Sequence, residues 1–210
     1  MQIKICGLKK FEDAETSVKS GADFIGFIFV PGSKREVSPK EVFEIIEGLK
    51  NKFPTMDTKL VGLFGNQKKS EIESIIKCTS IDIAQICGED DIDIGYPSIR
   101  QIRIKESHKP SDILDLVQRA LLVHNYAVLD SYNEKALGGT GNSFSWEKAS
   151  NVIGLTNVFV SGGLNCENIN ELSNKYHPYG VDVSSGVETR GLKDRNKIRA
   201  RQLLVNERRN

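Results

Sequence analysis

Short runs of apolar, mostly β-branched residues alternate with longer amphipathic segments along the whole chain. The short runs have the length of buried strands, and the segments between them carry apolar residues at helical spacing. We predict strands at 2–6, 24–29, 59–64, 81–86, 99–105, 126–130, 157–160 and 180–183. We predict helices at 11–20, 39–50, 68–78, 111–123, 145–152, 166–175 and 194–206, and a short turn instead of a helix after Gly88.

Strands that alternate with helices in this way form a parallel sheet with crossover helices. Eight strands, eight helices and their loops at ordinary lengths use roughly 190 residues, which suits a chain of 210. A doubly wound dinucleotide-binding fold is the main alternative, but the turn after the first strand, Cys6-Gly7-Leu8-Lys9-Lys10, lacks the glycine fingerprint of that fold. We therefore expect an α/β protein, a (β/α)8 TIM barrel, with residues 1–210 as a single domain.

Charge and hydropathy exclude several classes of partner. The formal net charge is +1, so no overall field attracts nucleic acid or an anionic membrane. The longest dense apolar run, 24–30, is far shorter than the roughly 20 residues that span a bilayer, and the first residues do not resemble a signal peptide. The basic stretch 195–209 has an apolar face and is better interpreted as a solvated last helix than as a nucleic-acid patch. We expect a cytoplasmic protein.

Cysteines and histidines are not spaced as metal ligands. None of the four cysteines form a CxxC pair, and His108, His124 and His177 form no HxxxH pair, so we predict no metal site. The histidines precede helices or strands at the amino-terminal end of the predicted barrel, where we expect surface or loop positions. The cysteines are expected to be small buried hydrophobic residues, with the exception of Cys6.

Glycine and serine turns follow the seventh and eighth predicted strands. A parallel barrel carries its active site at the carboxyl ends of the strands, and phosphate binds after strands seven and eight. Backbone N–H groups of such turns, placed before helix starts, can surround an anion, although tight packing is the alternative reason for the glycines. A further run in the connection after strand six would close over the phosphate, or is a flexible surface loop. The predicted phosphate-binding residues are Gly162, Gly163, Ser185, Gly186, Gly139, Thr140 and Gly141.

Two ionisable side chains end strands at the predicted mouth. Asp130 ends strand six and Cys6 ends strand one, so a carboxylic acid and a thiol would face each other as general acid and general base. For these roles the pKa of Asp130 must rise from about 3.9, and that of Cys6 must fall below about 8.5. Lys4 shares the strand parity of Cys6 and is a candidate to lower the thiol pKa, or else forms a buried scaffold pair.

Seven ordered motifs extend across nearly the whole chain. They are Lys4-Ile5-Cys6-Gly7-Leu8, Gly26-Phe27-Ile28-Phe29 with Ser33 and Arg35, Val61-Gly62-Leu63-Phe64 with Asn66, Leu129-Asp130, Gly138-Gly139-Thr140-Gly141 with Phe144 and Trp146, Gly162-Gly163-Leu164-Asn165, and Gly180 to Glu188. With these motifs the chain resembles the phosphoribosylanthranilate isomerase family of tryptophan biosynthesis. The Cys-Gly after strand one distinguishes that family from related phosphate-binding barrels of histidine biosynthesis, which carry an Asp there.

The resemblance implies an Amadori rearrangement of N-(5-phosphoribosyl)anthranilate to 1-(2-carboxyphenylamino)-1-deoxyribulose 5-phosphate, without cofactor or metal. By the family pattern, Asp130 protonates the ribose ring oxygen and Cys6 removes the C2 proton. Arg35 matches the position that holds the anthranilate carboxylate, and its planar fork suits that task. Asp182 would contact the sugar. The partner is thus a small-molecule phosphosugar-anthranilate substrate, bound by a monomer or a homodimer.

One position departs from the family. After strand four the family usually reads Gln-Leu-His-Gly, whereas this chain reads Gln85-Ile86-Cys87-Gly88, which puts substrate contacts near strand four in doubt. Two other functions remain as alternatives. The first is a barrel that binds a phosphate ligand without turnover, which the intact Cys6 and Asp130 argue against. The second is a broader isomerase that also accepts the histidine-pathway aminoaldose, which would be expected to carry Asp in place of Cys6.

Overall fold

A computed structural model describes residues 1–90, 92–131 and 144–206 of the chain. Eight parallel strands close into a barrel in which each strand pairs with its neighbours in sequence and β1 pairs with β8. This confirms the (β/α)8 prediction. The strands are β1 (Gln2–Cys6), β2 (Phe24–Ile28), β3 (Lys59–Phe64), β4 (Ile83–Ile86), β5 (Ser98–Ile104), β6 (Tyr126–Ser131), β7 (Val158–Val160) and β8 (Gly180–Val183).

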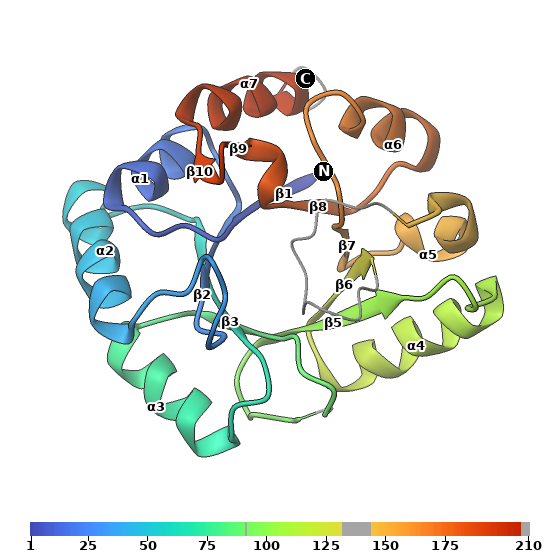
Figure 1. Cartoon of the computed structure of the whole chain (residues 1–210), viewed down its shortest axis with the longest axis horizontal. Coiled ribbons are helices and arrows are strands. Elements are labelled where there is room, and N and C mark those ends of the chain that lie inside the picture. Colours follow the sequence, from blue (N-terminus) through green and yellow to red (C-terminus); the bar gives the residue numbers. More distant parts are fainter. Residues whose placement is uncertain (91, 132–143, 207–210) are drawn as a thin grey trace.

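Helices form the outer ring around the strands (Figure 1). Ser38 begins one of them with a capping box in which its side chain accepts from Glu41 N, and Pro39 occupies the first helical position. The ring closes where Arg195 Nε meets Asp13 Oδ1 at 3.0 Å, which ties the last helix to the first. The helices are α1 (Phe11–Lys19), α2 (Pro39–Lys52), α3 (Lys69–Thr79), α4 (Pro110–Val123), α5 (Ser150–Ile153), α6 (Ile169–Tyr176) and α7 (Arg195–Asn206).

Three connections differ from a uniform βα repeat. The described residues between β4 and β5 contain no helix, as predicted for that acidic turn, and the ring of Figure 1 is open there. The segment predicted as one helix at 145–152 is a 3-10 turn, η1 (Trp146–Ala149), followed by the short α5. Helix α6 begins three residues later than predicted because the Asn165 side chain accepts from the backbone N–H groups of Glu167 and Asn168, forming a turn first.

A short hairpin after β8 is absent from the elements that the sequence pattern predicts. After β8 a 3-10 turn, η2 (Ser185–Val187), leads into a hairpin of β9 (Glu188–Thr189) and β10 (Leu192–Lys193). Its turn is possible because Arg190 and Gly191 both take positive φ, of 53° and 77°. The register places Lys193 directly opposite Glu188.

Side chains along each strand alternate between two cores. Outward side chains such as Ile3, Ile5 and Phe27 pack with the apolar faces of the helices. Inward side chains form a second, smaller cluster of Cys6, Phe24, Val61, Leu63, Ile83, Cys87, Ile99, Val128 and Phe159. Five buried polar or charged residues share the inward parity: Lys4, Gln85, Gln101, Asp130 and Asp182.

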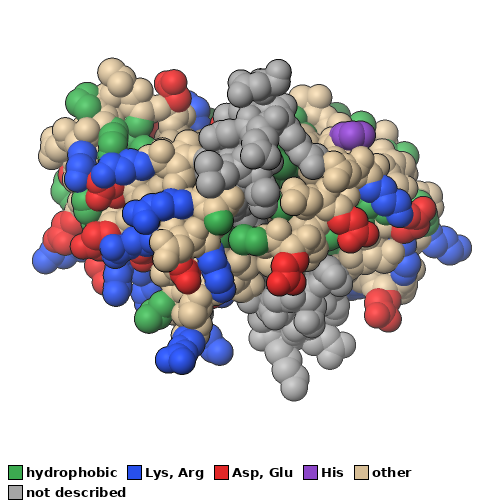
Figure 2. Space-filling model, turned by 90° about the horizontal axis from the view of Figure 1, so that it is seen from above, with side chains coloured by type: hydrophobic (Ala, Val, Ile, Leu, Met, Phe, Trp, Pro, Cys, Tyr) green, Lys and Arg blue, Asp and Glu red, His purple; other side chains and the backbone are tan. Residues whose placement is uncertain are grey.

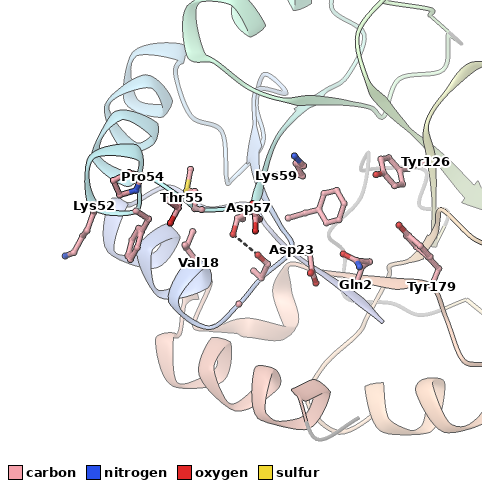
Figure 3. A pocket seen from close by; sticks show the side chains of 16 residues that line it. Gln2, Val18, Asp23, Lys52, Pro54, Thr55, Asp57, Lys59, Tyr126 and Tyr179 are labelled. Carbon is pink, nitrogen blue, oxygen red and sulfur yellow. Dashed lines mark hydrogen bonds between the residues drawn. The ribbon is translucent and has the colours of Figure 1, made fainter. Parts of the chain in front are cut away.

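Aromatic rings fill the amino-terminal end of the barrel. Phe159 meets Phe24 edge-on at 5.2 Å between centroids, and Tyr126 and Tyr179 pack around the same ring. A surface pocket of about 630 Å³ opens beside them. Figure 3 shows Tyr126 and Tyr179 on one side of this pocket. Because the pocket is lined by residues that begin strands, it lies at the opposite end from the predicted active site.

Candidate active site

A buried ion pair spans the middle of the barrel interior. Lys4 on β1 and Asp182 on β8 are direct partners in the strand register, and Lys4 Nζ lies 2.6 Å from Asp182 Oδ2. Burial lowers the pKa of Lys4, but the Asp182 carboxylate together with Cys6 and Cys87 holds that pKa above its ordinary value. Asp182 Oδ1 is buried and has no partner within the part of the chain that is described. This oxygen therefore keeps an acceptor site that none of the described residues uses.

Replacement of Lys4 by methionine is expected to leave the Asp182 carboxylate buried without its cation. The free energy of unfolding should fall by about 3–5 kcal/mol, the usual cost of breaking a buried pair by removing one partner. The pKa of Cys6 should rise, because the Lys4 charge acts to lower it. Denaturant unfolding and titration of thiolate absorption measure the two effects. The double variant Lys4→Met/Asp182→Asn is the control, and equal stability of the single and double variants would contradict the pair's role.

Cys6 lies at the carboxyl end of β1 and is 4% exposed. Its register partner on β2 is Gly26, where a Cβ would lie 2.9 Å from Cys6 Sγ. The missing side chain at Gly26 therefore leaves room for the thiol. Burial raises the pKa of Cys6 above its ordinary value, the Lys4 charge opposes this, and Asp182 adds to it. The expectation of a lowered thiol pKa is therefore wrong. Lys4 acts in the predicted direction, but burial outweighs it.

Asp130 lies near the carboxyl end of β6, with two strands, β7 and β8, between it and β1 on one side of the barrel. Its Oδ1 accepts from Ser131 N at 2.8 Å, and its Oδ2 accepts from the Gln101 amide at 2.8 Å. Burial raises the pKa of Asp130 to about 6, with Asp182 adding to the rise and the two hydrogen bonds opposing it. The direction agrees with the prediction for a general acid. Gln101 was not predicted, although its inward parity on β5 signals it.

Cys87 occupies the inward position that follows β4. Gln85 Nε2 lies 3.5 Å from Cys87 Sγ, and Cys6 and Asp130 both act electrostatically on the thiol. Burial raises the pKa of Cys87 to about 12. A thiol with such a pKa stays protonated at neutral pH, so Cys87 adds a weak donor to the mouth and no second base.

The turns after β7 and β8 lie against each other and against the acid. Gly162 and Gly163 take positive φ, of 81° and 64°, and a Cβ on Gly162 would be 3.0 Å from Asp130 Oδ1. A Cβ on Gly186 would overlap the Leu164 carbonyl oxygen. The turn that begins with Gly162 and Gly163 therefore lies against Asp130 on one side and against the turn of Ser185 and Gly186 on the other. The other three predicted phosphate ligands, Gly139, Thr140 and Gly141, lie outside the described residues.

Arg35 lies in the connection between β2 and α2, and its side chain extends over the turn that follows β1. Its Nε donates to Glu188 Oε1 at 2.7 Å and its Nη2 to Glu188 Oε2 at 2.9 Å. Because a Cβ on Gly7 would lie 2.5 Å from Arg35 Cδ, the arginine stem passes directly over the residue that follows Cys6. Lys193 also contacts Glu188, at 2.7 Å. Sequence reasoning had assigned no role to Glu188 or Lys193.

The histidines lie apart from this site. His124 is buried in the loop that follows α4, where its Nδ1 meets Ser98 Oγ at 2.8 Å, so it has the expected loop position but does not lie on the surface. Within the described ranges, no three His, Cys, Asp or Glu side chains gather as a metal ion would require. No helix there has the length and apolarity to cross a membrane. Figure 2 shows Lys and Arg side chains interspersed with Asp and Glu, so neither sign dominates that face.

Comparisons with known proteins converge on one family. The family model described as N-(5'phosphoribosyl)anthranilate (PRA) isomerase matches residues 3–202. The N-(5'-phosphoribosyl)anthranilate isomerase of Listeria welshimeri is 38% identical over 94% of this chain and 95% of its own. The phosphoribosyl anthranilate isomerase structure from Thermus thermophilus matches with a TM-score of 0.83, 27% identity and 99% of each chain. A structure of a phosphoribosyl anthranilate isomerase in complex with reduced 1-(o-carboxyphenylamino)-1-deoxyribulose 5-phosphate matches with a TM-score of 0.79, 27% identity and 99% of each chain.

Proposed function

The chain belongs to the N-(5'-phosphoribosyl)anthranilate isomerase family of tryptophan biosynthesis, and we propose how its residues carry out the isomerisation. Its ligand is a small phosphosugar. The observation that carries the proposed mechanism is the pair of buried groups at the barrel mouth, the Asp130 carboxyl with a pKa of about 6 and the Cys6 thiol. A group that titrates near neutral pH is well matched to proton transfer.

Asp130 is the proposed general acid. Its proton passes to the ribose ring oxygen while the bond between that oxygen and C1 breaks, and the anthranilate nitrogen lone pair forms the C=N bond of a Schiff base. Cys6 is the proposed base. Its thiolate removes the C2 proton, the electrons of that C–H bond form a C1=C2 double bond, and the C=N electrons return to nitrogen. The enolamine then takes a proton at C1 and releases one from the C2 hydroxyl, so substrate and product have the same atoms and oxidation level.

The charged groups around the mouth are proposed to hold the substrate. Arg35 binds the anthranilate carboxylate, with Glu188 fixing the plane of the guanidinium through two hydrogen bonds. Asp182 contacts a sugar hydroxyl through its unpartnered Oδ1. The phosphate lies on the turns after β7 and β8, at Gly162, Gly163, Ser185 and Gly186. Gly139, Thr140 and Gly141 remain proposed contacts from the connection after β6.

Replacement of Gly186 by alanine is expected to raise the KM for the phosphorylated substrate by about tenfold or more, because one misplaced phosphate contact costs a charge-assisted hydrogen bond. The added methyl must displace the Leu164 carbonyl, so the turns after β7 and β8 move apart. Steady-state kinetics measure the effect. Gly154→Ala is the matched control, because a Cβ there meets only ordinary contacts at 3.5 Å and beyond. An unchanged KM in the folded Gly186→Ala variant would exclude this turn from the phosphate site.

The proposed function is tested by following anthranilate fluorescence with freshly generated N-(5-phosphoribosyl)anthranilate. The protein is expected to consume this substrate catalytically without added metal or cofactor, also after treatment with a chelator. A protein that binds the reduced product analogue but leaves the substrate unchanged would instead be a binding barrel. Consumption of the histidine-pathway aminoaldose at a comparable rate would indicate the broader isomerase.

Three further expectations belong to this proposal. We propose that residues 1–210 form one domain, because the barrel closes between β1 and β8 and α7 packs on α1. The enzyme is proposed to work in the cytoplasm, with no nucleic-acid or membrane partner. Whether it acts as a monomer or a homodimer stays a prediction that sedimentation analysis would decide.

A further inference from the structure

A charge network lies beside Cys6, and one of its members, Lys193, has no role in the mechanism above. Glu188 accepts from two cations, Arg35 and Lys193, and the Lys193 side chain is only 4% exposed. Lys193 Nζ also donates to the Ser184 carbonyl at 2.9 Å. Two cations and one carboxylate leave this corner of the barrel with a net positive charge.

The network is joined to Cys6 through the main chain. Ser184 Oγ donates to the Cys6 carbonyl oxygen at 3.2 Å, and the same hydroxyl lies 3.4 Å from Lys193 Nζ. Arg35 passes over Gly7, where a Cβ would also meet Ser184 Oγ at 3.1 Å. Lys193 therefore contacts Ser184, which packs against the Cys6-Gly7 turn, and Glu188, the carboxylate that orients Arg35 over that turn.

The hairpin β9–β10 places this lysine. It leaves the barrel after η2, turns at Arg190 and Gly191, and returns so that Lys193 faces Glu188. The hairpin lies next to α7 (Figure 1), where Lys197 Nζ donates to the Glu188 carbonyl at 2.7 Å. An ammonium group is costly to bury, and a well-packed apolar side chain would hold a hairpin at least as well. A buried lysine at this place therefore indicates a use for its charge.

We propose that Lys193 is a positioning residue of the isomerase: its buried ammonium anchors Glu188, and through it Arg35, and supplies positive charge that favours the thiolate of Cys6. This inference rests on the proposed roles of Cys6 and Arg35. It assigns Lys193 no contact with the substrate. One network around Lys193 thus favours the ionised form of Cys6, which removes the C2 proton. The same network fixes the position of Arg35, which holds the ring carboxylate.

The electrostatics of the thiol support this role. Burial is the largest influence on the pKa of Cys6 and raises it, whereas the charges of Lys4 and Lys193 both lower it. Burial also lowers the pKa of Lys193, which Glu188 and Cys6 counteract. The titratable and charged groups that act on Cys6, or are acted on by it, come from five parts of the barrel: Lys4, Asp182, Lys193, Arg35 and Cys87.

The test compares Lys193→Met and Lys193→Gln with the parent and with Lys197→Met. Lys193→Gln removes the charge but keeps a hydrogen-bond donor. It therefore tests the charge in a variant in which the hairpin is expected to stay in place. Lys197→Met removes a lysine that contacts the Glu188 main chain and not its carboxylate. In each protein the Cys6 thiolate is titrated by its ultraviolet absorption, with the matching Cys6→Ala protein subtracted, and thermal unfolding checks the fold. Activity is then measured across pH.

We expect the Cys6 thiolate to form at higher pH in both Lys193 variants, with kcat/KM at neutral pH about tenfold lower, since a tenfold smaller thiolate fraction lowers the rate in proportion. Lys197→Met should leave both unchanged. A purely structural lysine would lower the unfolding temperature without moving the thiolate titration, and that result overturns the proposal. Because the titration needs no substrate, a shifted thiolate in a protein that does not isomerise would refute the proposed function and leave the influence of Lys193 on Cys6 standing.

Discussion

Replacement of Asp130 by asparagine is expected to lower kcat/KM about 100- to 10,000-fold, the range that a general acid contributes. The break in the pH profile near pH 6 should also disappear, so that the rate of the variant rises with pH until Cys6 is ionised. In the parent, Asp130 loses its proton near pH 6 and Cys6 only at higher pH, so most neutral-pH molecules hold a carboxylate and a thiol. The reactive form has a protonated Asp130 and an ionised Cys6. It carries as many protons as the dominant form, so it makes up a small and constant fraction of the enzyme at any pH between the two pKa values. The profile is therefore bell-shaped.

The stability of the same variant separates chemistry from folding. A carboxyl whose pKa is raised on folding is destabilised by ionisation, so its cost to the fold grows as pH rises from about 4 to about 6. Asparagine cannot ionise, and Gln101, whose buried Oε1 has no partner in the described structure, can turn its amide to accept from it. We expect the free energy of unfolding above pH 6 to be unchanged or up to about 3 kcal/mol higher.

The control for this prediction is Asp115→Asn, which replaces an exposed carboxylate on α4 that pairs with Arg119. It should retain parent kinetics and the break near pH 6. A large loss of kcat/KM in Asp130→Asn, together with a more stable fold, would show that Asp130 acts in catalysis. Parent-like kcat/KM in Asp130→Asn, with the break near pH 6 intact, would show that another group donates the proton.

Replacement of Cys6 by alanine is expected to reduce kcat/KM by a similar factor, about 100- to 10,000-fold, because the base is removed. Cys6→Ser should fall as far, since a hydroxyl is much harder to ionise than a thiol and the site is buried. The thiolate absorption assigned to Cys6 should disappear, and the residual rate should fall above about pH 6, where Asp130 loses its proton and no thiolate formation offsets that loss. Steady-state kinetics across pH measure the loss.

Cys78→Ser is the matched control, because Cys78 is an exposed thiol near the end of α3. Its activity should equal that of the parent. Parent-like activity in Cys6→Ser would contradict the assignment, since a serine at this position cannot supply a base of comparable strength.

The barrel was predictable because its signals are local. Each strand shows a short apolar run with alternating parity, and the start of α2 carries its own signal in Ser38, Pro39 and Glu41. The same parity correctly placed Lys4 and Cys6 on one side of β1. The late start of α6 and the splitting of 145–152 into η1 and α5 depend on side-chain turns and short helical segments, which propensity describes poorly.

The electrostatics of the site were less predictable because they depend on burial and on distant partners. The sequence places Lys4 near Cys6, but only the packed barrel shows that burial outweighs this charge. Glu188 lies 153 residues from Arg35, and no local pattern pairs them. The hairpin that carries Lys193 is two residues per strand, too short for a periodic signal.

The most direct test of the acid-base account follows the hydrogen on ribose C2. Substrate carrying deuterium at C2 is mixed with excess enzyme, and the label remaining in the product is measured over a single turnover for the parent, Cys6→Ala and Asp130→Asn. The account predicts that the parent removes the deuterium more slowly than protium and that Cys6→Ala retains it. Asp130→Asn should turn over slowly without an isotope effect, because ring opening then limits the rate. Loss of the C2 deuterium from Cys6→Ala at the parent rate would contradict the account.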